Sequence, residues 1–151
     1  MSVSEDLPAG STWSEIELGK QGWIVFLERF NFDAWGTVTY RVPTRSAGTA
    51  IRRAVRTLRK FYRGIGVRKI RAFIVAEPHE SGCYHAHLLF KCGAPAGDEL
   101  RRRELLKAIF DFVRVELGRC SFEGVRDQQA VRAYVGKYLI KRSAEWWISP
   151  S

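Results

Sequence analysis

The sequence predicts an α+β domain in which helices flank a mainly antiparallel sheet, related to the ferredoxin-like pattern. Three observations predict this class. Segments that read as strands occur at 34–42, 69–77, 83–91 and 120–126. Segments with helical signals occur at 46–64, 98–117 and 128–141. The turn at 77–82 joins two strands into a hairpin whose loop is longer than two residues.

The first strand, at 34–42, alternates, is rich in β-branched and aromatic residues, and ends at Pro43. The segment before it, 22–30, reads equally as a short edge strand or a helical turn. The helix at 46–64 begins with Ser46 or Thr49 as its cap and ends at Gly64. Its apolar face is expected to consist of Ile51, Val55, Leu58 and Phe61 or Tyr62.

The second half of the chain continues this pattern. Asp98 caps a helix that ends at Gly118, and Asp127 starts the last helix. The tail, with Trp146 and Trp147, is expected to pack back on the domain. The inward residues of the 98–117 helix are predicted to be Leu105, Leu106, Ile109, Phe110, Val113 and Leu117.

Composition indicates one globular, cytoplasmic domain. The chain has 151 residues, of which 46% are apolar, enough for a real core. We expect a loose segment at 1–20 and a single domain at 21–151. No apolar run could cross a bilayer, and the N-terminus lacks the features of a signal peptide. Three cysteines, an odd number, suit a reducing compartment.

The charge favours a polyanionic partner. The net charge is +9, and no acidic residue occurs between Asp33 and Glu77. A well-solvated basic surface is the alternative interpretation. In the 46–64 helix, four arginines fall on one stripe and are the candidate contacts to DNA phosphates: Arg52, Arg56, Arg59 and Arg63.

Two histidines, His85 and His87, lie one residue apart in the 83–91 strand. Strand alternation places both on one face, with Ala86 and Leu88 directed to the core. Glu77 ends the neighbouring strand, which the hairpin folds back beside them. A His, His, Glu set suits Mn²⁺ or Mg²⁺, or a catalytic Zn²⁺.

The histidine pair could also have one of two simpler roles. Both imidazoles could form hydrogen bonds within the sheet and bind no ion. Alternatively, Cys83, His85, His87 and Cys92 could hold a structural zinc ion, although alternation points Cys92 the other way.

The last predicted helix carries tyrosines and lysines three and four residues apart, on one face: Tyr134, Lys137, Tyr138 and Lys141. Because lysine is almost never fully buried, this face should line a wet or anion-binding surface. A tyrosine hydroxyl can act as a covalent nucleophile, and an adjacent ammonium favours the phenolate and neutralises a phosphate. The pattern predicts metal-assisted attack of tyrosine on a phosphodiester.

Three segments in this order resemble the HUH endonucleases, specifically the rolling-circle replication initiators (Rep proteins) of plasmids, phages and viruses. "WGTVTYR" is similar to the first motif, "EPHESGCYHAHLLF" to the His-hydrophobic-His motif, and "YVGKYLIK" to the tyrosine motif in its two-tyrosine form. Conjugative relaxases differ because their tyrosine precedes the histidines. Small transposases of the same superfamily remain an alternative, as does a non-catalytic single-strand or hairpin DNA-binding protein.

The resemblance implies a five-stranded antiparallel sheet of ferredoxin or RRM type and nicking and joining of single-stranded DNA at an origin. It assigns the metal to His85, His87 and Glu77, with Mn²⁺ or Mg²⁺ as cofactor. Tyr134 and Tyr138 become the nucleophiles, with a 5′-phosphotyrosine intermediate, and Lys137 lies between them. The implied partners are single-stranded or hairpin origin DNA and a helicase and polymerase of a bacterial or archaeal host. Because a Walker-type loop is lacking, we expect a nuclease-only initiator or a truncated nuclease domain.

Overall fold

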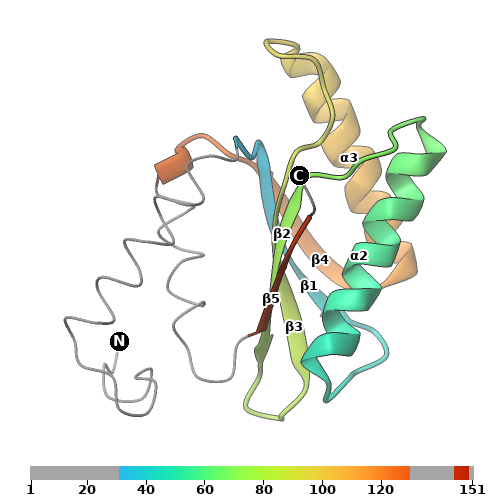
Figure 1. Ribbon diagram of the computed structural model, residues 1–151, viewed down its shortest axis with the longest axis vertical. Helices are drawn as coiled ribbons and strands as arrows, with labels where there is room; N and C mark the ends of the chain where they lie inside the picture. Colours follow the sequence, from blue (N-terminus) through green and yellow to red (C-terminus); the bar gives the residue numbers. More distant parts are fainter. Residues whose placement is uncertain (1–30, 130–144, 150–151) are drawn as a thin grey trace.

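The computed structural model describes residues 31–129 and 145–149, and it confirms the α+β class (Figure 1). One antiparallel sheet has the strand order β4-β1-β3-β2-β5. Helices α2 and α3 lie on the same face of this sheet. The elements are β1 Ala34–Tyr40, α2 Ala47–Gly64, β2 Ala72–Pro78, β3 Tyr84–Phe90, α3 Glu99–Glu116, β4 Gly118–Gly124 and β5 Glu145–Ile148.

The structure corrects three strand predictions. β2 begins at Ala72, because Ile70 packs in the core before the ladder starts. β4 begins at Gly118, two residues before the predicted strand. The tail at Glu145–Ile148 is a fifth strand that pairs with β2, so Trp146 and Trp147 lie on opposite faces of the sheet. The expected segments 1–20 and 22–30 lie outside the described residues, as does 130–141 of the last predicted helix.

Helix α2 follows its predicted amphipathic pattern. The Ser46 side chain caps it by accepting a hydrogen bond from Thr49 N at 3.1 Å. Two buried tyrosines connect elements on the helix side of the sheet: Tyr40 OH donates to Ala50 O, and Tyr62 OH donates to Lys91 O at 2.6 Å. The predicted apolar face is buried, with Ile51, Val55, Leu58, Phe61 and Tyr62 all in the core.

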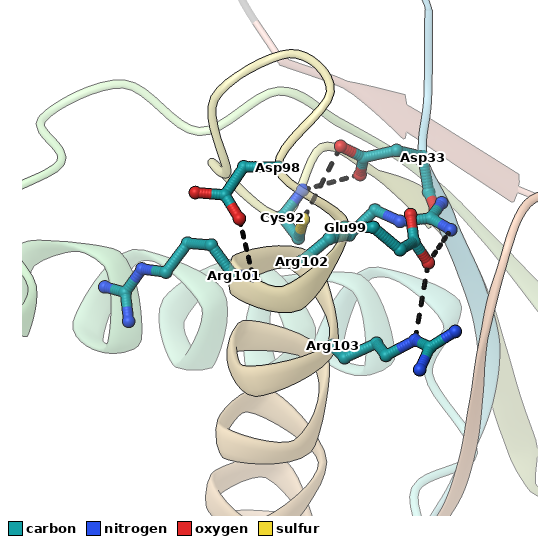
Figure 2. Close-up of polar contacts among 7 residues, drawn as sticks. All are labelled: Asp33, Cys92, Asp98, Glu99, Arg101, Arg102 and Arg103. Carbon is teal, nitrogen blue, oxygen red and sulfur yellow. Dashed lines mark hydrogen bonds and ion pairs between the residues drawn. The ribbon is translucent and has the colours of Figure 1, made fainter.

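The start of α3 is anchored to the residue before β1, Asp33 (Figure 2). Asp98 caps the helix by accepting from Arg101 N at 3.0 Å, as predicted. The Asp33 carboxylate accepts from Cys92 N at 2.7 Å and contacts Cys92 Sγ at 3.5 Å. Arg102 donates from Nη1 to Asp33 O at 3.3 Å, so the 91–98 loop and the helix are fixed to the same segment.

The two faces of the sheet differ in what they carry. Ala86, Leu88 and Phe90 of β3 point to the helices and join the core, which confirms the predicted direction of Ala86 and Leu88. On β1, Gly36 lies against the Phe122 ring, which would clash with any added Cβ. The opposite face carries the alternate residues of the same strands, including both histidines.

Candidate metal centre

The β2–β3 hairpin carries all three residues of the predicted metal site. In the antiparallel register Glu77 lies directly opposite His85, and His87 follows two residues along the same strand. The turn between the strands is fixed by hydrogen bonds from His79 N to Cys83 O, 2.8 Å, and from Gly82 N to His79 O, 2.9 Å. Gly82 has a φ of +83°, a conformation that side chains other than glycine rarely adopt.

Three donor atoms converge at this position. His87 Nε2 lies 2.9 Å from His85 Nε2 and 2.9 Å from Glu77 Oε2, and His85 Nε2 lies 3.4 Å from Glu77 Oε2. The side chains are largely shielded from solvent, with exposed fractions of 14% for His85 and Glu77 and 7% for His87. The site is therefore compact and only slightly open.

The triangle fits a divalent cation. With metal–ligand distances of about 2.1 Å, neighbouring ligand atoms are about 3.0 Å apart at right angles and about 3.4 Å apart at tetrahedral angles. The three observed separations fall close to these values. Protons satisfy the triangle less well, because one hydrogen on His87 Nε2 cannot bond His85 Nε2 and Glu77 Oε2 equally. A cation can accept a lone pair from all three atoms.

A third imidazole, His79, lies beside this triangle and was missed by the sequence reasoning, which treated it as part of a turn. Its exposed ring lies against the His85 ring, with centroids 4.0 Å apart and planes inclined by 45°. Its position two residues after Glu77 was the available signal. His79 covers one side of His85 and so restricts the orientations open to that ring.

The same sheet face also carries hydroxyl groups and one arginine. Thr39 is paired with His85 on one side and Arg119 on the other, while Thr37 is paired with His87 and Ser121. The Thr37 and Ser121 hydroxyl oxygens are 3.0 Å apart. Alternation along β1 could have placed both threonines on the histidine face, but the position of Arg119 required the pairing of β4 with β1.

The four predicted DNA-contacting arginines, Arg52, Arg56, Arg59 and Arg63, are exposed on α2. They therefore lie on the opposite side of the sheet from the histidines. The predicted residues Tyr134, Lys137, Tyr138 and Lys141 lie outside the described residues.

The alternative zinc site with two cysteines is not formed. Cys92 is fully buried in the helix-face core, on the other side of the sheet from the histidines. Burial raises the pKa of its thiol to about 11, so the thiol stays protonated at neutral pH. The described cluster with metal-ligand spacing consists of Glu77, His85 and His87.

An antiparallel sheet with helices on one face and a His-x-His strand beside a glutamate on the other defines the class of Rep-type HUH proteins. The model of the replication-associated protein family of the ORF2 type matches residues 33–143, and this chain belongs to that family. The resemblance seen in the three sequence motifs is thereby confirmed at the level of the family.

Other comparisons add little. No match is found among curated proteins. One solved structure, the N-terminal nuclease domain of minute virus of mice non-structural protein 1, is similar with 11% identity and a TM-score of 0.32. The similarity covers 89% of this chain and 73% of that one, and it is too distant to support an assignment. In the described part of the chain, no helix has the length and apolarity that a bilayer span requires.

Proposed function

We propose that this chain is a rolling-circle replication initiator that nicks and rejoins single-stranded DNA at an origin. The observation that carries the proposal is the convergence of Glu77, His85 and His87 in a chain of the replication-associated family. The chemistry is transfer of a phosphodiester to a tyrosine, assisted by a divalent cation such as Mn²⁺ or Mg²⁺.

The residues that would hold the cation are Glu77, His85 and His87, through one oxygen and two Nε2 atoms. When bound, such an ion withdraws charge from the phosphate and makes phosphorus more electrophilic. Thr37, Thr39 and Arg119 lie next to the triangle on the same face and are available to bind the DNA strand. The guanidinium of Arg119 supplies a positive charge for a neighbouring phosphate.

The described tyrosines support the assignment of the nucleophile by elimination. Of the five tyrosines in the sequence, Tyr40 and Tyr62 are buried on the helix face, and Tyr84 packs against the same core. Burial raises the pKa of Tyr40 and Tyr62 above the ordinary value, and both hydroxyls donate to backbone carbonyls. The nucleophile then falls to Tyr134 or Tyr138.

The ends of the segment that carries these tyrosines also support the proposal. Gln129 follows β4 and Glu145 begins β5, which are the two opposite edges of the sheet. A connection between them spans four strand spacings, about 19 Å. A helix over residues 130–144 would be about 22 Å long. Because α2 and α3 already cover the other face, the face with the metal triangle is the available path.

The proposed reaction exchanges one bond for another. The tyrosine oxygen attacks phosphorus, a tyrosine O–P bond forms, and the bond from phosphorus to the 3′-oxygen breaks. The tyrosine proton passes to solvent and the 3′-oxygen takes up a proton, which leaves a 3′-OH and a 5′-phosphotyrosine. The reverse step rejoins the strand. Lys137 and Lys141 would favour the phenolate forms of Tyr134 and Tyr138.

The test is formation of a covalent adduct. The protein is incubated with labelled single-stranded DNA carrying the origin of its replicon and Mn²⁺, and the product is run on a denaturing gel. We expect an adduct that EDTA prevents, that Tyr134→Phe reduces strongly, and that the Tyr134→Phe/Tyr138→Phe double variant abolishes. An adduct in the double variant would place the nucleophile elsewhere.

The same assay separates the alternatives. A non-catalytic DNA-binding protein would retard the labelled strand on a native gel and give no adduct on the denaturing gel. A small transposase would depend on one tyrosine alone, so Tyr138→Phe would behave as the wild type through repeated rounds of cleavage and joining.

A further inference from the structure

We infer that the groove between α2 and Trp147 is a second binding site for single-stranded DNA, separate from the metal face. It would hold a segment of the strand other than the one being cut. The inference rests on the proposed function only in taking DNA as the ligand.

The groove is a basic channel with an apolar floor. It has a volume of about 590 Å³, and Ile51 and Val55 of α2 form part of its lining together with Trp147 of β5. Its cationic lining is provided by Arg52, Arg56, Arg59, Lys60 and Arg63. The row from Arg52 to Arg63 extends about 16 Å along the helix, long enough for several phosphates of one strand.

The arginines of this row are not neutralised within the described structure. Across residues 31–129 and 145–149, none of the four arginines forms an ion pair, whereas Lys60 is paired with Glu116 at 2.9 Å. Arg52 donates to Thr49 Oγ1, and Arg59 lies over the Trp147 ring at 5.9 Å from its centroid. Positive charge thus accumulates along one side of α2 without a compensating carboxylate.

The groove and the metal triangle lie on different sides of the sheet. α2 packs on β2 and β3 through the face that carries Ile74 and Leu88, while His85 and His87 project from the other face. A packed layer adds about 10 Å of separation. One phosphate therefore cannot contact both, and a strand that occupies both sites must pass around an edge of the sheet.

Trp147 favours single-stranded over duplex DNA. Its indole is half-buried and forms part of the groove lining beside the arginines. Aromatic rings stack with unpaired bases and, together with a basic groove, are the usual elements of single-strand binding. A duplex presents its phosphates but keeps its base faces stacked inside, so it would use the arginines and not the indole.

The experiment counts binding sites with labelled oligo(dT). At saturation, native mass spectrometry should find two molecules of an eight-nucleotide oligo(dT) per wild-type chain and one per Arg56→Ala/Arg59→Ala chain. A thirty-nucleotide oligo(dT) can engage both sites at once, so the variant should bind it about ten-fold or more weakly. The control, Arg101→Ala/Arg103→Ala, removes the same charge from α3 and should bind within two-fold of the wild type.

Several outcomes would overturn the inference. Equal stoichiometry in wild type and variant would do so, as would a single site that the variant loses, since the arginines would then belong to one continuous track. Tighter binding of a twelve-base-pair duplex than of the short oligo(dT) at this groove would overturn the single-strand assignment. Mn²⁺ affinity should be unchanged in the variant, and a wild-type chain that forms no covalent adduct would still show two sites.

Discussion

The two faces of the sheet are built from the same strands and serve opposite purposes. On β3, Leu88 is 2% exposed and packs under the helices, whereas His87, its immediate neighbour, contributes to the metal triangle on the other side. The helix face is apolar and closed by α2 and α3. The histidine face gathers hydroxyls, imidazoles, a carboxylate and a guanidinium. One residue of register therefore separates residues that stabilise the fold from residues proposed to do chemistry.

This difference indicates that stability and activity can be changed independently. A side chain on the helix face contributes buried apolar area, and its loss leaves a cavity. A ligand on the histidine face contributes little apolar packing, and its loss removes a charge partner of the proposed cation. Substitutions on the two faces should therefore have separable effects.

The largest effect is expected for His87→Ala. Loss of one of the three donor atoms should lower Mn²⁺ affinity by more than about a hundred-fold, because even the partners that orient metal ligands cost 10–100-fold when removed. Adduct formation should then fall below detection, while the melting temperature without metal changes little. Calorimetric titration with Mn²⁺ measures the affinity. His79→Ala, which removes an imidazole outside the triangle, is the control, and equal losses in the two variants would argue against the site.

Leu88→Ala should have the converse effect. Truncating this buried leucine should lower the free energy of unfolding by about 2–5 kcal/mol, measured by urea denaturation. Mn²⁺ affinity of the folded fraction should stay within two-fold of the wild type. If Leu88→Ala weakened metal binding as much as His87→Ala does, the two faces would be coupled and the comparison above would fail.

Arg119→Ala tests whether the histidine face binds DNA beyond the metal. Arg119 is exposed two strands from His85, about 10 Å away across the sheet. Loss of one phosphate contact should reduce the slope of log K against log salt for single-stranded DNA by about 0.7. Arg114→Ala removes an exposed arginine from α3 and should leave the slope for a short single strand unchanged. An identical slope in both variants would remove Arg119 from the DNA path.

The smallest effect concerns the pH dependence of stability on the helix face. Cys92 has a pKa of about 11 in the fold against its ordinary value of 9.0, chiefly because of burial. The unfolded chain loses this proton first, so stability should fall as pH rises from about 9 to about 11 and be independent of Cys92 below that range. Urea denaturation between these values should show a smaller loss in Cys92→Ala, and parallel curves for the two proteins would contradict the assignment.

Local patterns predicted the site better than the sheet. Strand alternation placed His85 and His87 on one face, the hairpin brought Glu77 to them, and the caps Ser46 and Asp98 marked both described helices. These features depend on neighbours in sequence. The tail with Trp146 was not predicted as a strand, because four residues with one tryptophan on each face show no alternation.

Long-range pairing was the part that the sequence could not supply. Arg119 reaches the histidine face only because β4 pairs with β1, and no residue near it in sequence indicates that partner. The four arginines of α2 were expected to contact DNA, but their position behind the sheet depends on which side the helix packs. Handedness and layer order are properties of the assembled domain and leave no local signal.

The strand order also has a consequence for how the chain folds. Among the five described strands, β2 and β3 alone form a hairpin, whereas β1 pairs with β3 and β4, and β2 with β5, over long stretches of sequence. Non-local pairing slows folding because chain entropy is lost before contacts are gained. We expect the β2–β3 hairpin to form early, since its loop is short. The segment that carries Glu77, His85 and His87 would then serve as the template on which the central and edge strands assemble.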